Sequence, residues 1–112
     1  MPVLLERVVD LRPGQEWYSD PFELHPGRTV HIYAVGTIPS YIDAVNTALF
    51  DQWNEEGKAG PESSRPWPFP FGSDRLTHDR FVPIVIGGPF RLVVRLGVFN
   101  TAGRVRVRVS ED

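Results

Sequence analysis

The run from Arg104 to Val109 alternates arginine and valine without a break, and it constrains the fold more than any other stretch. Successive side chains of a strand point to opposite faces, so Val105, Val107 and Val109 share one face and the three arginines share the other. A helix repeats every ~3.6 residues and would mix the two residue types around its surface. The run therefore predicts a half-buried strand, with valines toward a core and arginines toward solvent.

A second apolar run, residues 90–99, precedes it and shows the same alternation. Its first face holds Phe90, Leu92, Val94, Leu96 and Val98, and its second face holds Arg91, Val93, Arg95 and Phe99. A short polar loop that ends in Gly103 joins the two runs. Two long strands joined in this way predict an antiparallel hairpin, which we take as the spine of a β-sandwich.

The chain before residue 41 divides into further strand-like segments separated by turns. The predicted strands cover residues 3–11, 15–24 and 29–35. The first alternates imperfectly, which suits a strand partly covered on both faces. Pro21 has no N–H to donate, so the second should lie at a sheet edge or bend there. The stretch from Gly36 to Ser40 contains Pro39 and is expected to end the third strand.

Residues 41–53 fit the spacing of a short helix or of a strand, and their strand-like neighbours favour a strand. Residues 54–79 show no apolar period, and so long a connection in a compact domain is usually functional or mobile.

The sequence therefore predicts a single all-β domain over 1–112, an antiparallel jelly-roll-like sandwich with at most one short helix, confined to 41–55. The predicted core includes Val30, Ile32, Phe90, Leu92, Val94, Leu96, Val105, Val107 and Val109.

The composition argues against several classes of partner and site. A net charge of −2 disfavours nucleic acid as the partner, and no apolar run approaches the ~18 residues of a membrane span. The absence of cysteine removes disulfides, thiolate metal sites and cysteine nucleophiles, and it favours a reducing, cytoplasmic location. The first residues, MPVLLERVVD, lack a basic region leading into an apolar one, so we expect no signal peptide.

Prolines and aromatics alternate in residues 66–71, which read PWPFPF. In an extended chain, Trp67, Phe69 and Phe71 share one side and the prolines share the other. The prolines have no N–H to donate to a neighbouring strand, so this segment cannot be a central strand. The favoured interpretation is that the three aromatics fold back as a lid over an open end of the sandwich, because exposing them together is costly. The alternative is that they dock onto a partner.

Five arginines and no acidic residue fall within residues 87–110. They are Arg91, Arg95, Arg104, Arg106 and Arg108. The predicted hairpin would set them side by side. The simpler interpretation is that they are solvent-facing strand positions that discourage pairing between sheet edges. The alternative is that they form a binding face for carboxylates, which arginine engages with two parallel hydrogen bonds. The acids would come partly from residues 43–62 and partly from another protein.

The order of these signals resembles a known group of domains. Residues 21–34, PFELHPGRTVHIYA, residues 48–57, ALFDQWNEEG, and residues 81–109 are similar to bacterial pre-peptidase C-terminal and GOLD-type jelly-roll sandwiches. A bacterial family known only as a domain of unknown function is similar at Leu49, Asp51 and Asn54 and over residues 90–109. The resemblance implies a non-enzymatic accessory or interaction module and assigns no functional residues.

Motifs for catalysis are not visible. The sequence has no Gly-x-Ser-x-Gly, no phosphate loop and no pair of histidines at metal-ligand spacing. His78 and Asp79 beside Arg80 could form a polar cluster. Asp43, Asp51 and Asp74 could converge on a calcium ion, although no fixed spacing supports it. We therefore expect no catalytic residue, no metal and no cofactor.

Three functions remain in order of preference. The first is a module that binds a protein partner, or a second copy of itself, through a sheet face or edge and the Pro-aromatic segment. Its binding residues would be Arg91, Arg95, Arg104, Arg106, Arg108, Trp67, Phe69 and Phe71. The second is a carbohydrate-binding module that stacks sugars on the exposed aromatics Trp53, Trp67 and Phe69. The third is a small β-barrel enzyme, which needs a pocket with His31 or His78 near an acid.

Overall fold

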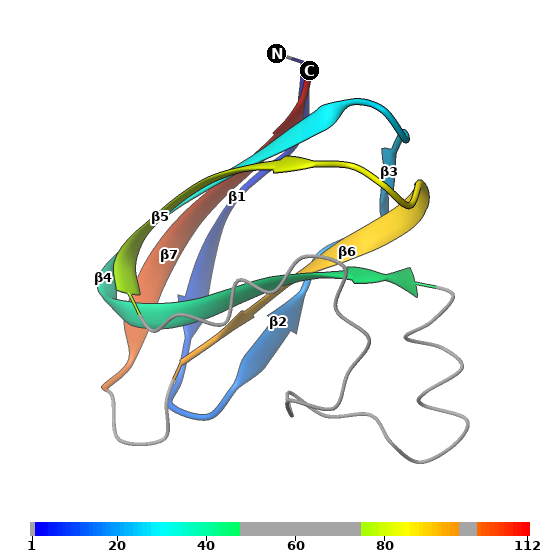
Figure 1. The fold of residues 1–112 in the computed structure, drawn as a ribbon. Helices are drawn as coiled ribbons and strands as arrows, with labels where there is room; N and C mark the ends of the chain where they lie inside the picture. Colours follow the sequence, from blue (N-terminus) through cyan, green and yellow to red (C-terminus); the bar gives the residue numbers. More distant parts are fainter. Residues whose placement is uncertain (1, 48–74, 97–100) are drawn as a thin grey trace.

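The computed structural model describes residues 2–47, 75–96 and 101–112, and the seven elements assigned within these ranges are all β-strands (Figure 1). The strands are β1 (Val3–Leu11), β2 (Glu16–Tyr18), β3 (Phe22–Leu24), β4 (Thr29–Asn46), β5 (Arg75–Pro83), β6 (Gly88–Arg95) and β7 (Gly103–Glu111). Every pairing between them is antiparallel. The predicted antiparallel all-β class is confirmed.

The strands form two sheets that share β4. Sheet A has the order β1-β7-β4-β5, and sheet B places β6 between β4 on one side and the short strands β2 and β3 on the other. Because β4 runs through both sheets, they are joined at one corner and curl around a common interior (Figure 1). At the opposite side β1 comes close to β2 and β3. The result is a strongly curved, nearly closed, barrel-like arrangement.

The bend of β4 makes this arrangement possible. Its first part pairs with β7 and β5, its last part, from Tyr41, pairs with β6, and the register with β5 shifts between Val35 and Ser40. The bend is tight at Gly36, where a Cβ would come within 2.8 Å of the carbonyl oxygen of Ile38. The prediction that the third strand ends here is wrong, because Gly36 and Pro39 bend the strand without ending it. The strand favoured for residues 41–53 is confirmed for 41–46.

The core lies between the two sheets and is built from the inward positions of every long strand. All nine predicted core residues are buried, with exposed fractions of 0% or 1%. They are joined by residues of β1, β3 and the second part of β4, among them Leu5, Leu24 and Ile42. Period-two alternation therefore assigned the faces of β4, β6 and β7 correctly.

Strands β6 and β7 form as predicted, but they do not pair with each other. β7 lies in sheet A between β1 and β4, whereas β6 lies in sheet B between β4 and the pair β2 and β3. The predicted hairpin over 90–109 is therefore wrong. Alternation determines which face a side chain joins, but it does not identify the neighbouring strand, and consecutive strands are partners in most folds but not in all.

Strands β2 and β3 act as one edge strand that is interrupted before Pro21. Ser19, at the break, keeps the interrupted segment attached to β6. Its backbone N–H donates to the carbonyl oxygen of Leu92 at 2.9 Å, and its hydroxyl accepts the N–H of Leu92 at 2.9 Å. The hydroxyl replaces a backbone acceptor where the strand breaks. The prediction that 15–24 lies at an edge or bends at Pro21 is confirmed for the edge, because β2 and β3 pair with β6 alone in the described ranges.

Strand β5 occupies the end of the connection that showed no apolar period. In the part of the chain that the structure describes, it pairs with β4 alone and is therefore an edge strand. Its inner face carries His78, Arg80 and Val82, opposite the buried Ala34, Ile32 and Val30. Phe81 stands on the outer face and is 62% exposed. A histidine and an arginine inside and a phenylalanine outside hide the alternation, so sequence patterning missed this strand.

Candidate binding face

The three arginines of β7 are exposed on the outer face of sheet A, as alternation predicts. On one side, β1 sets Glu6, Val8 and Asp10 opposite Arg108, Arg106 and Arg104. On the other side, β4 sets Tyr33 and Val35 opposite Arg108 and Arg106. We name this surface the arginine face, and it consists of Val8, Tyr33, Val35, Arg104, Arg106 and Arg108.

Arg104 is neutralised within the protein. Its Nε donates to Asp10 Oδ1 at 2.8 Å, and this hydrogen bond, with the charge of Asp10, raises the pKa of Arg104 above its usual value. Both side chains are largely exposed, so solvent screening leaves the pair little effect on stability. The acid beside the arginines therefore comes from β1. Of the predicted acidic segment 43–62, the structure describes 43–47, and Asp43 pairs with Val93 in sheet B.

Arg108 has an aromatic neighbour. Its guanidinium carbon lies 5.8 Å from the centroid of the Tyr33 ring, within the range of a cation–π contact. Glu6 stands opposite Arg108 on β1. Arg108 is thus engaged by the face of the Tyr33 ring, and a carboxylate stands at the register position across β1.

Arg106 lies between two valines. Its cross-strand neighbours are Val8, which is 53% exposed, and Val35, which is 39% exposed. Among the residues that the structure describes, Arg106 makes no ion pair, unlike Arg104. The centre of the arginine face is therefore a positive charge set in an exposed apolar row.

A histidine and a carboxylate meet farther along the same sheet. His31 Nε2 lies 2.6 Å from Asp79 Oδ1, and the His31 ring stacks on Phe81 with centroids 4.1 Å apart. A histidine near an acid is one of the two conditions set above for an enzyme. The second condition, a pocket around that histidine, is not met in the described clefts, neither of which is lined by His31 or His78.

His78 and Asp79 do not form the polar cluster considered from the sequence. They are neighbours on a strand, so they point to opposite faces. His78 is buried and its Nε2 donates to the carbonyl oxygen of Ser40 at 2.9 Å, whereas Asp79 is exposed on the outer face beside His31. Within the described ranges, no three histidine, aspartate or glutamate side chains gather where they could share a metal ion.

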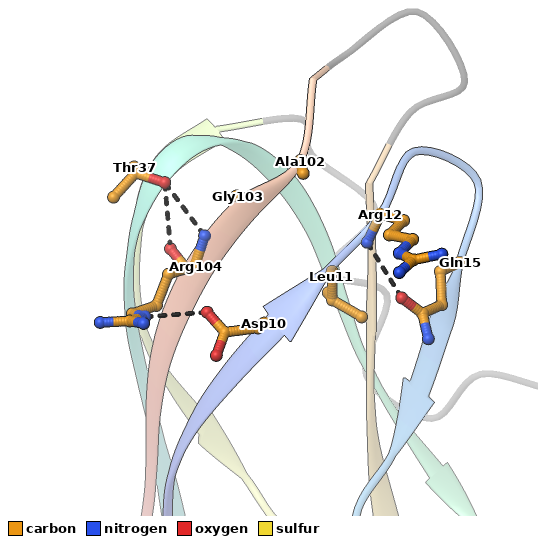
Figure 2. Close-up of a pocket in the computed structure, with 8 residues that line it drawn as sticks. All are labelled: Asp10, Leu11, Arg12, Gln15, Thr37, Ala102, Gly103 and Arg104. Atoms are coloured by element: carbon orange, nitrogen blue, oxygen red, sulfur yellow. Dashed lines mark hydrogen bonds and ion pairs between the residues drawn. The ribbon is translucent and has the colours of Figure 1, made fainter.

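A shallow cleft of about 720 Å³ opens where the turn between β1 and β2, the bend of β4 and the start of β7 meet (Figure 2). The Arg104 backbone N–H donates to Thr37 Oγ1 at 3.0 Å, and the Arg12 backbone N–H donates to Gln15 Oε1 at 2.9 Å. Asp10 faces Arg104 across β1 and β7 (Figure 2). These side chains are bonded within the protein and hold the turn and the bend in place.

The grouping of Arg91 and Arg95 with the arginines of β7 is wrong, because β6 lies in the other sheet. Both are half-buried on the outer face of sheet B. Arg91 Nη1 donates to the carbonyl oxygen of Ser19 at 3.0 Å, and the Arg95 guanidinium lies 4.5 Å from the centroid of the Tyr41 ring. Within sheet B, Arg91 is thus held by a backbone carbonyl oxygen and Arg95 by an aromatic ring.

The predicted aromatic binding residues, Trp67, Phe69 and Phe71, lie outside the described residues, as does Trp53. Three residues of the arginine face were not predicted: Val8, Tyr33 and Val35. Val8 gave a signal, because it contributes to the imperfect alternation of β1, from which the sequence predicts cover on both faces. The structure shows instead that Val8 is exposed. Tyr33 and Val35 could not be found in this way, because alternation identifies the face that a residue joins but not its neighbours across strands.

Comparison with known proteins does not add to this geometry. The chain matches no protein-family model, no curated protein and no solved structure. The resemblance to pre-peptidase C-terminal and GOLD-type domains therefore stays a prediction. In the described ranges there is no helix with the length and apolar character required to cross a membrane.

Proposed function

We propose that this protein is an interaction module that binds an acidic segment of a partner protein through the arginine face. The observation that carries the proposal is the position of Arg106 between the exposed Val8 and Val35, with no acidic side chain opposite it. Arg104 bonds Asp10, and Arg108 lies over the Tyr33 ring and has the acidic Glu6, not a valine, opposite it on β1. The charge that the described fold leaves uncompensated is available to a carboxylate of another molecule.

The composition of the surface also supports a protein partner. Arginine and aromatic residues are enriched at protein interfaces, and the outer face of sheet A combines three arginines with Tyr33, His31 and Phe81. Single exposed apolar residues are ordinary, but here Val8 and Val35 flank the same arginine. Arginine stays protonated and offers several donors in a planar fork, which suits the recognition of carboxylates.

The test measures binding of fluorescent peptides by anisotropy at low and at high salt. One peptide alternates glutamate and serine, and its counterpart carries lysine in place of each glutamate. We expect the parent protein to bind the glutamate peptide and not the lysine peptide, with an affinity that falls as salt rises. Replacing Arg106 with serine (Arg106→Ser) should weaken binding about threefold to tenfold, as for a charge-assisted hydrogen bond discounted for exposure.

The matched control is Arg12→Ser, which removes an exposed arginine of the turn between β1 and β2, outside the arginine face. It changes the net charge by the same amount and should alter binding much less. The double variant Arg106→Ser/Arg108→Ser should fold as the parent does and bind still more weakly. If the double variant binds the peptide and self-associates as the parent does at low salt, the arginines serve solubility alone and the proposal fails.

A further inference from the structure

A hollow of about 420 Å³ lies on the arginine face between β1, β4 and β7. Val8, Val35 and Tyr33 contribute apolar lining, and Arg104 and Arg106 contribute positively charged lining. Its place follows from the bend of β4, which begins at Gly36 beside it. A volume at the lower end of the range for small-ligand pockets can take one or two side chains, but not a folded element.

The chemistry of the hollow differs from that of a simple anion site. A bare anion would gain from Arg106 but nothing from the two valines that flank it. An apolar side chain alone would gain from the valines but would leave Arg106 without a counterion. The combination is complementary to an apolar group and a carboxylate carried close together on one chain.

We propose that the hollow binds a bulky aliphatic or aromatic side chain of the partner's acidic segment, while the neighbouring carboxylate of that segment engages Arg106. This inference rests on the proposed function and adds the sequence that the partner must have. Arg106 is the arginine to engage, because Arg104 already bonds Asp10 at 2.8 Å and Arg108 lies over Tyr33. The partner motif is therefore a leucine, isoleucine or phenylalanine adjacent to an aspartate or glutamate.

The test uses two fluorescent peptides of equal length and charge. The first contains glutamate and serine only. The second replaces one central serine, next to a glutamate, with leucine. A side chain that is half buried in the hollow should tighten binding about fivefold to tenfold, at roughly 0.8 kcal/mol per buried CH₂ group. We expect the parent protein to show this preference for the leucine peptide.

The preference should disappear in the double variant Val8→Thr/Val35→Thr, which keeps the β-branched shape and replaces two methyl groups of the hollow with hydroxyls. The matched control is Val3→Thr, since Val3 lies on the same strand and is 52% exposed, against 53% for Val8. Circular dichroism and urea unfolding should show that all three proteins are folded.

Each outcome addresses a different claim. If neither peptide binds the parent, the proposed function fails. If both peptides bind the parent equally, the proposed function stands and the inference about the hollow is overturned. The inference is also overturned if the leucine preference survives in Val8→Thr/Val35→Thr. Light scattering adds a final criterion. If the parent is a dimer and Val8→Thr/Val35→Thr is a monomer, a second copy of the chain fills the hollow, and the inference about an acidic segment is overturned.

Discussion

Two buried serines with opposite hydrogen-bonding states give the sharpest test of the fold. Ser19 and Ser40 are both fully buried, with exposed fractions of 0%. The Ser19 hydroxyl accepts the N–H of Leu92 at 2.9 Å and donates to the carbonyl oxygen of Asp20 at 2.8 Å. Within the described residues the Ser40 hydroxyl has no hydrogen-bond partner. The same substitution at the two positions should therefore have different consequences.

Replacing Ser19 with alanine leaves the buried N–H of Leu92 without an acceptor. The cost of an unsatisfied buried donor is about 1–3 kcal/mol. In a domain of this size, each kcal/mol lowers the midpoint of thermal unfolding by roughly 4 °C, so Ser19→Ala should lower it by about 4–12 °C. Urea unfolding should give the same loss of free energy with an unchanged dependence on denaturant, because the surface buried on folding stays the same.

Ser40→Ala is the matched control, since it removes a buried hydroxyl that makes no hydrogen bond to the described part of the chain. It should be neutral or slightly stabilising, because burying an unpaired polar group costs free energy. If Ser19→Ala is as stable as the parent, the hydroxyl does not serve as the acceptor of Leu92. If both variants lose the same stability, the loss reflects a change of volume in the core, and the hydrogen-bond reasoning is refuted.

Three further predictions concern the core, a close contact and an edge. Leu92→Ala should cost about 2–5 kcal/mol in urea unfolding, the range for a buried large-to-small change, and a loss below about 0.5 kcal/mol would contradict the assigned face of β6. Gly87→Ala should destabilise by about 1–3 kcal/mol in the same assay, because a Cβ would lie 2.5 Å from Pro26 Cδ and 2.9 Å from the carbonyl oxygen of Leu24. Arg80→Val should preserve folding but increase self-association in light scattering, because it removes an inward-facing charge from the edge strand β5. A variant that stays as monodisperse as the parent would show that Arg80 does not protect that edge.

The faces of the long strands could be predicted because burial imposes a period of two on the sequence. In β4, β6 and β7 every inward position from Val30 to Ala34, from Phe90 to Leu96 and from Val105 to Val109 is apolar. Strand β5 could not be predicted in this way. Its inner positions include His78 and Arg80, so its sequence does not show the contrast between faces on which the method depends.

The pairing of the strands could not be predicted, and this limited the prediction of the site. Alternation placed Arg104, Arg106 and Arg108 on one face correctly. It could not show that β1 and β4 flank β7, since the residues that face each other across strands are far apart in the chain. The sequence therefore grouped the arginines of β6 with those of β7. It did not identify Val8 and Val35 as the neighbours of Arg106 on β7. The candidate site depends on which strands pair and in which register, and a single sequence does not reveal either.

The edges of the described sheets explain why a partner would meet a face and not an edge. Arg7 lies opposite Val107 and Arg80 lies opposite Ile32, so both occupy inward positions, on the edge strands β1 and β5. A strand added beside either one would have to bury its charge or displace it. A third edge, formed by β2 and β3, is short and is interrupted between Tyr18 and Phe22, a stretch that includes Pro21, which has no N–H to donate. Backbone pairing with another chain is thus opposed at these three edges. The outer face of sheet A carries its charges and apolar side chains toward solvent, and side-chain recognition there requires no rearrangement of the strands.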